Sequence, residues 1–313
     1  MKKTVILFIS FVFSSALFAQ QLAVHNQYYL NSSLVNPAAT AITDCKTFGI
    51  SDKHQWLGIQ GAPSIQTFYA QVPKQFSKYK KHGLGANLVR DNNGATQNLG
   101  CELIYTFQMF LGRSNTRLSL GLSGKLGQYT FDERDFTEYL IDPAISRTVF
   151  SEFYYNAASG FYLYSDRFFG GLAVYNLLPL STEYYLEYGN DSFFSTLLAG
   201  YYFKPRKNKF NIKSTVYIAR GENLLQVDLK NRICFENQIS SGILIRKYLG
   251  DLMSANQNVI LFVGYDLDKW NFQYCFDLGI NRLQMNNYGS HQVSVGYRIC
   301  RDIYDCPTYD KSK

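Results

Sequence analysis

The feature that most constrains this chain is an alternation of apolar side chains with polar or small ones, repeated from about residue 47 to residue 299. In residues 116–127, Leu118, Leu120 and Leu122 stand at every second position, and residues 270–279 repeat the pattern with aromatic side chains. A period of two puts alternate side chains on opposite faces of a β-strand. The 25 Tyr, 24 Phe and 23 Gly, against 7 Pro, also favour strands joined by tight turns. The chain is therefore predicted to be all-β.

Fourteen segments follow this pattern, which is an even number. Their expected bounds are residues 47–51, 64–72, 83–90, 98–108, 116–127, 153–164, 167–176, 192–203, 210–219, 224–236, 238–246, 257–267, 270–280 and 289–299. A soluble sandwich also alternates, but its apolar face must pack on a second sheet while its polar face meets water. Here the second face is rich in Gly, Ser, Asn and Gln, which is typical of strands that separate lipid from an enclosed polar interior.

The lengths of the connections favour the same architecture. If the first strand is entered from the periplasm, the outer connections are residues 52–63, 91–97, 128–152, 177–191, 220–223, 247–256 and 281–288. The inner turns are short and include Ser165–Asp166, Asn237 and Asp268–Lys269. Outer-membrane barrels have short periplasmic turns and long outer loops. We predict an outer-membrane β-barrel of about 14 antiparallel strands over residues 47–299, in preference to a soluble all-β domain.

The first residues predict export. Lys2 and Lys3 precede an apolar stretch from Val5 to Phe13, and small residues lead to Ala19. This stretch is shorter than the ~20 apolar residues of a membrane-spanning helix, so residues 1–19 are interpreted as a cleaved signal peptide. Residues 20–46 would then form an N-terminal periplasmic or plug segment, and residues 300–313 a periplasmic tail. The expected location is the outer membrane of a gram-negative cell envelope.

No pattern in the chain indicates catalysis or a bound cofactor. The four His residues show no metal-ligand spacing, and no nucleophile motif occurs. The formal charge is +7, but the basic residues lie in short clusters instead of along one face, so nucleic acid is not an expected partner. An acidic loop over residues 128–152 is interpreted as solvated or partner-binding. We predict a non-enzymatic protein without cofactor or metal.

Two basic turns lie on the predicted periplasmic side. Their residues are Lys74, Lys78, Lys80 and Lys81 in the first turn, and Lys204, Arg206, Lys207 and Lys209 in the second. Such clusters can anchor a barrel at anionic headgroups, or they can dock a periplasmic partner. Both interpretations stay open.

Six cysteines would enter an oxidising compartment, where disulfides form. Closure of a barrel places its first strand beside its last, so Cys45, Cys300 and Cys306 would share the periplasmic rim. We expect one bond among these three, either Cys300–Cys306 or Cys45 with one of the tail cysteines. Cys101 falls on an apolar face and is expected to be unreactive.

Several stretches, read together, resemble the PorP/SprF family of type IX secretion system membrane proteins. The residues that carry the resemblance are Gln27, Tyr28, Asn31, Asn36, Pro37, Ala38, Gln55, Trp56, Gly58, Gly61, Ala62, Pro63, Asp142, Pro143, Gln226, Asp228 and His291. The segment from Gln55 to Pro63 is the most specific. There Gly58 and Gly61 permit a tight or left-handed backbone, Pro63 stiffens the entry to the next strand, and Trp56 suits a membrane interface.

The resemblance implies an accessory barrel of the type IX secretion and gliding machinery. Its implied partners are outer-membrane lipid, other secretion components, and a large secreted cargo such as an adhesin, held by its C-terminal domain at loops 128–152 and 177–191. The alternative is a diffusion pore or uptake channel, since fourteen strands can enclose a lumen. Residues 22–44 or the loop 128–152 could plug that lumen.

Overall fold

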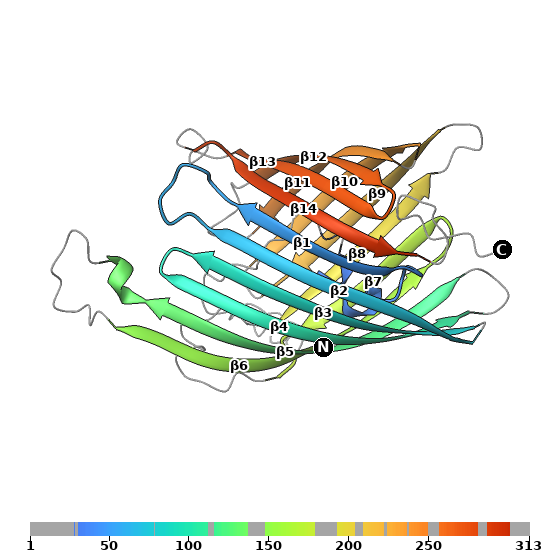
Figure 1. The fold of residues 1–313 in the computed structure, drawn as a ribbon, viewed down its shortest axis with the longest axis horizontal. Helices are drawn as coiled ribbons and strands as arrows, with labels where there is room; N and C mark the ends of the chain where they lie inside the picture. Colours follow the sequence, from blue (N-terminus) through green and yellow to red (C-terminus); the bar gives the residue numbers. More distant parts are fainter. Residues whose placement is uncertain are drawn as a thin grey trace, which may run out of the picture.

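The computed structural model describes Tyr28 and residues 31–77, 79–111, 116–136, 148–178, 193–203, 209–221, 224–236, 238–249, 257–280 and 287–300. Fourteen antiparallel strands close into one barrel (Figure 1), which confirms the predicted fold class. The strands are β1 (Lys46–His54), β2 (Ser64–Ser77), β3 (Lys80–Asn93), β4 (Thr96–Phe110), β5 (Arg117–Asp132), β6 (Val149–Tyr164), β7 (Phe168–Tyr175), β8 (Phe194–Phe203), β9 (Phe210–Arg220), β10 (Leu225–Phe235), β11 (Ile239–Leu249), β12 (Gln257–Leu267), β13 (Trp270–Ile280) and β14 (Ser290–Ile299).

The barrel closes where its first strand meets its last. β1 pairs with β14 from Lys46 opposite Ile299 to His54 opposite His291, and with β2 on its other side. Each strand from β2 to β13 pairs with its two neighbours in sequence. Closure leaves no open edge along this seam, as lipid requires because it cannot hydrogen-bond a backbone.

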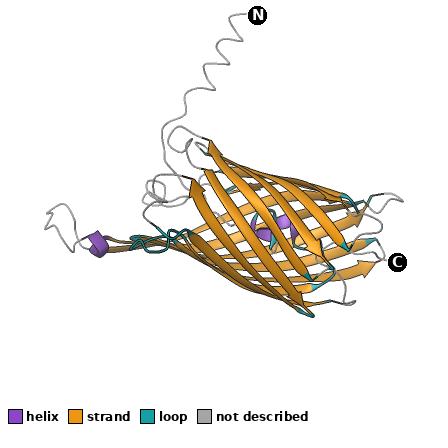
Figure 2. Ribbon diagram, turned by 90° about the horizontal axis from the view of Figure 1, so that it is seen from above, coloured by secondary structure: helices purple, strands orange, loops and turns teal. Residues whose placement is uncertain are grey.

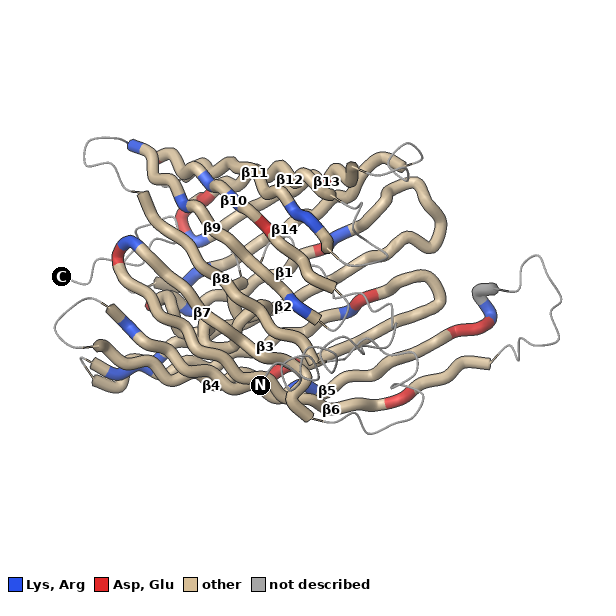
Figure 3. Tube along the Cα trace, turned by 180° about the vertical axis from the view of Figure 1, so that it is seen from behind, with Lys and Arg blue, Asp and Glu red and all other residues tan. Residues whose placement is uncertain are grey.

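The alternation read from the sequence separates the outside of the barrel from its inside. On β5, Leu120, Leu122 and Leu126 are 46%, 63% and 68% exposed, whereas Ser119 beside Leu120 is fully buried. Figure 3 shows that Lys, Arg, Asp and Glu are sparse along the wall. The outer surface is therefore an apolar face for lipid, and the inward face is polar.

The wall is not of uniform height. β3 to β6 have 14 to 16 residues, whereas β7 to β14 have 8 to 11. On the long strands the outward face changes from Leu to polar residues, so that residues 90–93, 96–98, 128–132 and 149–152 rise beyond the apolar band; we call these residues the blade (Figure 2). The apolar stretch of β4, from Leu99 to Met109, spans ~26 Å for a rise of ~3.4 Å per residue and a tilt of ~40°.

The blade corrects two predicted outer loops. The loop expected at 91–97 is a tight turn at Gly94–Ala95, and strands occupy both ends of the expected loop 128–152, since β5 continues to Asp132 and β6 begins at Val149. Above the apolar band the outward side chains no longer face lipid, so they no longer alternate with polar ones. The alternation that predicted the strand ends therefore stops before the strand pairing does.

Three short 3₁₀ helices complete the described structure: η1 (Ser32–Leu34), η2 (Pro37–Ala39) and η3 (Glu133–Phe136). Figure 2 shows helix inside the cage of strands and again at the tip of the β5–β6 hairpin. Within the described ranges, no helix has both the length and the apolar character needed to cross a bilayer.

Candidate functional site: the occupied lumen

The segment of residues 31–44, here named the lumen segment, lies inside the barrel and forms its two short helices locally. The side chain of Asn31 accepts a hydrogen bond from the Ser33 amide at 3.2 Å, and that of Asn36 accepts one from the Ala38 amide at 2.9 Å. Pro37 occupies the first helical turn, where its missing N–H costs no hydrogen bond. The Asn-Pro-Ala motif is therefore a helix start.

Hydrogen bonds in both directions join this segment to the wall. Asn36 Nδ2 donates to the carbonyls of Phe161 at 3.1 Å and Leu172 at 3.2 Å, which lie on β6 and β7. Further bonds come from wall hydroxyls: Thr106 Oγ1 to Pro37 O at 2.8 Å, Ser119 Oγ to Ala38 O at 2.7 Å, and Thr196 Oγ1 to Val35 O at 2.7 Å. Backbone groups that would otherwise lie unpaired inside the barrel are thus satisfied by β4, β5 and β8.

A buried amide network ties the start of the segment to β2, β3 and β4. Asn31 Nδ2 donates to Asn87 Oδ1 at 3.1 Å, and Gln71 Nε2 donates to Asn31 Oδ1 at 2.6 Å. Asn87 in turn donates to Glu102 Oε2 at 2.9 Å. Asn31 is fully buried, and protein side chains hydrogen-bond its amide oxygen and its amide nitrogen.

Glycines let the wall approach the segment closely. A Cβ built on Gly121 of β5 would lie 2.3 Å from the Ala38 amide nitrogen, and one on Gly83 of β3 would lie 2.6 Å from the Ala41 Cβ. Such distances are far below van der Waals contact. The lumen segment is therefore packed on bare backbone at these points.

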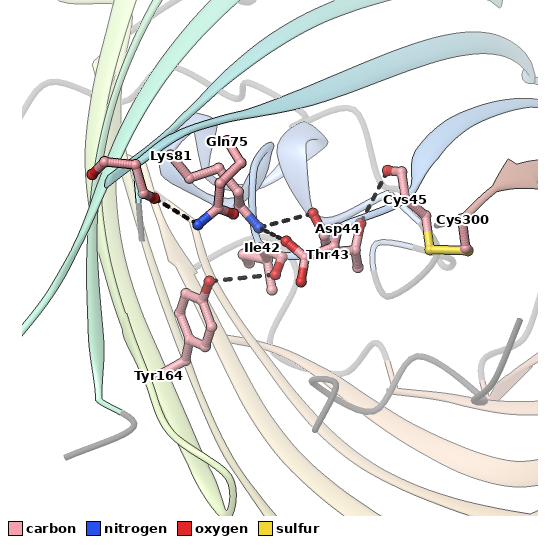
Figure 4. Close-up of polar contacts among 9 residues, drawn as sticks. Ile42, Thr43, Asp44, Cys45, Gln75, Lys81, Tyr164 and Cys300 are labelled. Carbon is pink, nitrogen blue, oxygen red and sulfur yellow. Dashed lines mark hydrogen bonds and ion pairs between the residues drawn. A yellow bond between two sulfur atoms is a disulfide. The ribbon is translucent and has the colours of Figure 1, made fainter. Parts of the chain in front are cut away.

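The end of the segment is fastened at the rim by an ion pair and a disulfide (Figure 4). Lys81 Nζ lies 2.6 Å from Asp44 Oδ1 and donates to Thr43 O at 3.1 Å, while Tyr164 Oη donates to Ile42 O at 3.3 Å. The structure joins Cys45 to Cys300, one of the pairings considered from the sequence. Lys81 is buried in this contact, which removes it from the expected basic docking surface because its ammonium faces the lumen segment.

Two family positions, Tyr28 and Asp228, come together on the far wall. Tyr28 stacks on Tyr217 with ring centroids 4.8 Å apart, and the Lys230 ammonium lies 5.4 Å from the centroid of the Tyr28 ring. Burial, followed by the nearby Asp228 carboxylate, raises the pKa of the Tyr28 phenol well above its ordinary value. The phenol therefore stays neutral.

The second family position, Asp228, forms a fork-to-fork pair with Arg246 on the next strand. Arg246 Nε and Nη2 each lie 2.8 Å from one carboxylate oxygen of Asp228, and both side chains are fully buried. Gln226 donates to the same carboxylate at 3.0 Å. The Gln-x-Asp motif thus supplies the acid and its hydrogen-bond donor on the inward face of β10, while Arg246 was not indicated by any sequence motif.

The most specific family segment, from Gln55 to Pro63, forms the β1–β2 loop at the opposite rim from the disulfide. Gly58 and Gly61 have φ of +97° and +70°, which confirms the left-handed backbone expected there. The Gln55 amide donates to Pro63 O at 2.9 Å, the Trp56 amide to Ser290 Oγ at 3.2 Å, and the Leu57 amide to Gly289 O at 2.8 Å. This loop therefore braces the β13–β14 connection.

The remaining predicted site residues are scattered or undescribed. Lys74, Lys80 and Lys209 are exposed at the disulfide rim, and Lys209 pairs with Glu236. His291 is hydrogen-bonded to Tyr274 Oη at 2.7 Å. The following lie outside the described residues: the signal peptide, Gln27, Lys78, Asp142, Pro143, Lys204, Arg206, Lys207 and Cys306. Across the described ranges, no three His, Cys, Asp or Glu side chains gather as metal ligands. Cys101 is a free, exposed thiol.

These observations converge with a comparison against protein families. The model of the type IX secretion system membrane protein PorP/SprF matches residues 17–297, which covers the lumen segment and the whole barrel. The chain belongs to the PorP/SprF family. As a PorP/SprF barrel it is an outer-membrane protein of type IX secretion, in contact with lipid and with other secretion components. No curated protein matches the chain.

Solved structures share the fold of this PorP/SprF protein at low identity. The deltaS2 mutant of the TodX monoaromatic hydrocarbon channel has a TM-score of 0.53 and 9% identity, and the match covers 86% of this chain and 94% of that one. The TodX deltaS2S3 mutant has a TM-score of 0.52 and 8% identity, with coverage of 90% and 96%. Omp33 of Acinetobacter baumannii has a TM-score of 0.45, 8% identity, and coverage of 82% and 99%.

Proposed function

We propose that this PorP/SprF protein is a plugged, non-enzymatic scaffold that helps a large exported protein, such as an adhesin, reach or stay on the cell surface. The observation that carries the proposal is the lumen segment. Hydrogen bonds, close packing on glycine and the Cys45–Cys300 disulfide fix it across the interior. A filled barrel suits a rigid membrane platform better than a solute path.

The two rims would then serve different partners. The disulfide rim exposes Lys74, Lys80 and Lys209, which suit contact with the periplasmic secretion machinery or with anionic headgroups. The opposite rim carries the blade and the braced Gln55–Pro63 loop, which suit contact with the cargo outside the membrane. Gliding motility would follow where the displayed cargo is an adhesin.

A channel is the second candidate, supported by the polar inward face. The TodX neighbours are described as a hydrocarbon channel, which is evidence about those proteins and extends to this chain only as a hypothesis. A steady conductance of the purified full-length protein in planar bilayers would favour this alternative, whereas a silent barrel favours the scaffold.

Gene deletion tests the scaffold. Surface-exposed proteins are labelled on intact cells and quantified with and without the gene. We expect one exported protein, or a small group, to disappear from the surface while other type IX cargo remains, and restoration of the gene should return it. An unchanged set of surface proteins would reject the proposal. Affinity purification from outer membranes then identifies the bound secretion components.

A further inference from the structure

A lysine and a histidine lie side by side on the lipid-facing side of the wall, close to the disulfide rim. The strand registers place Lys74 of β2 directly opposite His82 of β3, and His82 directly opposite Phe107 of β4. One step further from the rim, Leu84 stands opposite Tyr105, and their side chains are 62% and 46% exposed. Directly opposite residues share one face of a sheet, so Lys74 and His82 point the same way as the lipid-facing residues beside them.

Aromatic rings and one hydrogen bond hold the His82 imidazole in place. Its Nδ1 atom lies 2.6 Å from Tyr105 Oη, within hydrogen-bond distance. The ring centroids of Phe76 and Phe107 lie 4.3 Å and 5.2 Å from that of His82. The Lys74 ammonium lies 5.4 Å from the centroid of the same Phe76 ring. The ammonium and the imidazole therefore lie against one ring, with Tyr105 orienting the imidazole.

The depth of this cluster matches the headgroup region of a bilayer. Phe107 lies two residues before Met109, where the apolar stretch of β4 ends. Aromatic side chains of barrels gather at this level, and lysines near the end of a membrane span direct their ammonium toward it. The anionic group of a bilayer at this level is the lipid phosphate. The sequence has no Asp or Glu in residues 72–84 or 103–110, so these two stretches bring no acidic side chain to repel it.

The opposite rim carries a similar histidine–tyrosine pair in a different electrostatic setting. Tyr274 Oη lies 2.7 Å from His291 Nδ1. The residue opposite His291 on β1 is His54, and His54 Nε2 lies 2.9 Å from Asp52 Oδ2. A carboxylate thus stands beside this pair, whereas a lysine stands beside His82. The two pairs provide an internal comparison between a setting that repels phosphate and one that attracts it.

The position of the cluster on the side of the barrel favours lipid over a periplasmic protein. Lys209 illustrates the alternative, because it precedes β9 in the turn at the barrel end and pairs there with Glu236. A protein that approaches from the periplasm meets such end-on residues first. Lys74 and His82 instead lie beside the lipid-facing Leu84 and Tyr105, where acyl chains run along the wall.

We propose that Lys74, His82 and Tyr105 form a binding site for one anionic phospholipid of the periplasmic leaflet. Lys74 and His82 hold the phosphate, Tyr105 positions the imidazole, and an acyl chain lies along Leu84. The exposed Lys80 adds a second cation, so the site disfavours headgroups that carry their own ammonium. The site goes beyond the scaffold function and requires only that the barrel lies in a membrane.

Lys74 provides a variant and Lys209 its matched control. Each of Lys74→Gln and Lys209→Gln removes one exposed ammonium from the same rim. Native mass spectrometry of the purified full-length protein, titrated with phosphatidylglycerol in detergent, gives the lipid dissociation constant. We expect K74Q to raise it about tenfold, as for the loss of one hydrogen bond to a charged group, and K209Q to leave it unchanged. Heat-modifiable gel mobility must be normal in both variants.

A second variant tests the positioning role of Tyr105. Tyr105→Phe keeps the ring and removes the hydroxyl that orients His82. It should weaken phosphatidylglycerol binding less than K74Q does, and it should leave binding of the zwitterionic phosphatidylcholine unchanged. Unchanged phosphatidylglycerol binding in Y105F would remove Tyr105 from the site.

Photo-crosslinking locates the lipid. Phosphatidylglycerol with a diazirine next to its headgroup, in phosphatidylethanolamine vesicles that contain the protein, should label peptides that carry Lys74 or His82. Labelling at Tyr274 and His291 instead, equal dissociation constants for K74Q and K209Q, or equal affinity for phosphatidylcholine would overturn the site. So would unchanged lipid binding in K74Q together with reduced recovery of periplasmic secretion components, because the surface would then dock a protein. None of these results bears on the scaffold, whose test is gene deletion.

Discussion

Asp228 and Arg246 form the most completely buried ion pair of the described structure, with both side chains at 0% exposure. Such a pair is not a large source of net stability, because desolvation offsets most of the attraction, but removing one member leaves a buried charge uncompensated. The Gln-x-Asp motif identified Asp228 from the sequence. Arg246 could not be predicted as the partner of Asp228, because the pairing depends on the register of β10 and β11. That register places the two residues directly opposite each other.

Asp228→Asn should therefore destabilise the barrel by ~3–5 kcal/mol, because the buried Arg246 guanidinium loses the carboxylate that it faces. The measurement is denaturant unfolding of the detergent-purified protein. Glu236→Gln is the matched control, since it breaks the exposed Lys209–Glu236 pair, where solvent already screens both charges. Equal unfolding midpoints for D228N and E236Q would contradict the role given to burial.

At the scale of elements, strands were predictable because lipid and lumen impose opposite requirements on neighbouring side chains. The prediction stopped short where that contrast ends: Arg90 and Gln128 point outward above the lipid, so alternation fades although pairing continues. The placement of the lumen segment could not be predicted from periodicity. Asn36 of this segment is hydrogen-bonded to Phe161 and Leu172, which lie 125 and 136 positions away in the sequence. The local sequence pattern cannot predict contacts between residues so far apart.

Two glycines of β5 test how tightly that segment is held. Gly121 faces the lumen segment, where an added Cβ would lie 2.3 Å from Ala38 N, whereas a Cβ on Gly124 meets nothing within 4 Å. Gly121→Ala should displace the lumen segment and raise hydrogen exchange across residues 31–44. Gly124→Ala should leave exchange unchanged. If the amides of residues 31–44 are equally protected from hydrogen exchange in both variants, the close packing at Gly121 does not hold the segment.

For the whole molecule, the lumen segment and the barrel are separable in principle. The β1–β14 and β1–β2 ladders close the barrel through backbone pairing alone, and the lumen segment contributes no strand to them. The hydrogen bonds of the lumen segment to the wall come in addition to these strand ladders. They fix the segment inside a barrel that would otherwise be lined by polar side chains and open. The sequence left two candidate segments for a plug, residues 22–44 and the loop 128–152, and the hydrogen bonds from β4, β5 and β8 place Val35, Pro37 and Ala38 of the first inside the barrel.

Removing residues 31–44 should therefore open the barrel without dismantling it. Full-length protein in planar bilayers is expected to be silent, and the deletion variant to conduct steadily with heat-modifiable mobility retained. The current should favour anions, because the described inward faces of β9 to β13 carry Lys213, Lys230, Arg232 and Arg246 against three carboxylates, Asp228, Asp266 and Asp277. Arg232→Gln should then reduce the anion preference, since its guanidinium is a permanent charge facing the lumen. Silence of the deletion variant would show that residues 31–44 are not the barrier, and cation preference would refute the electrostatic argument.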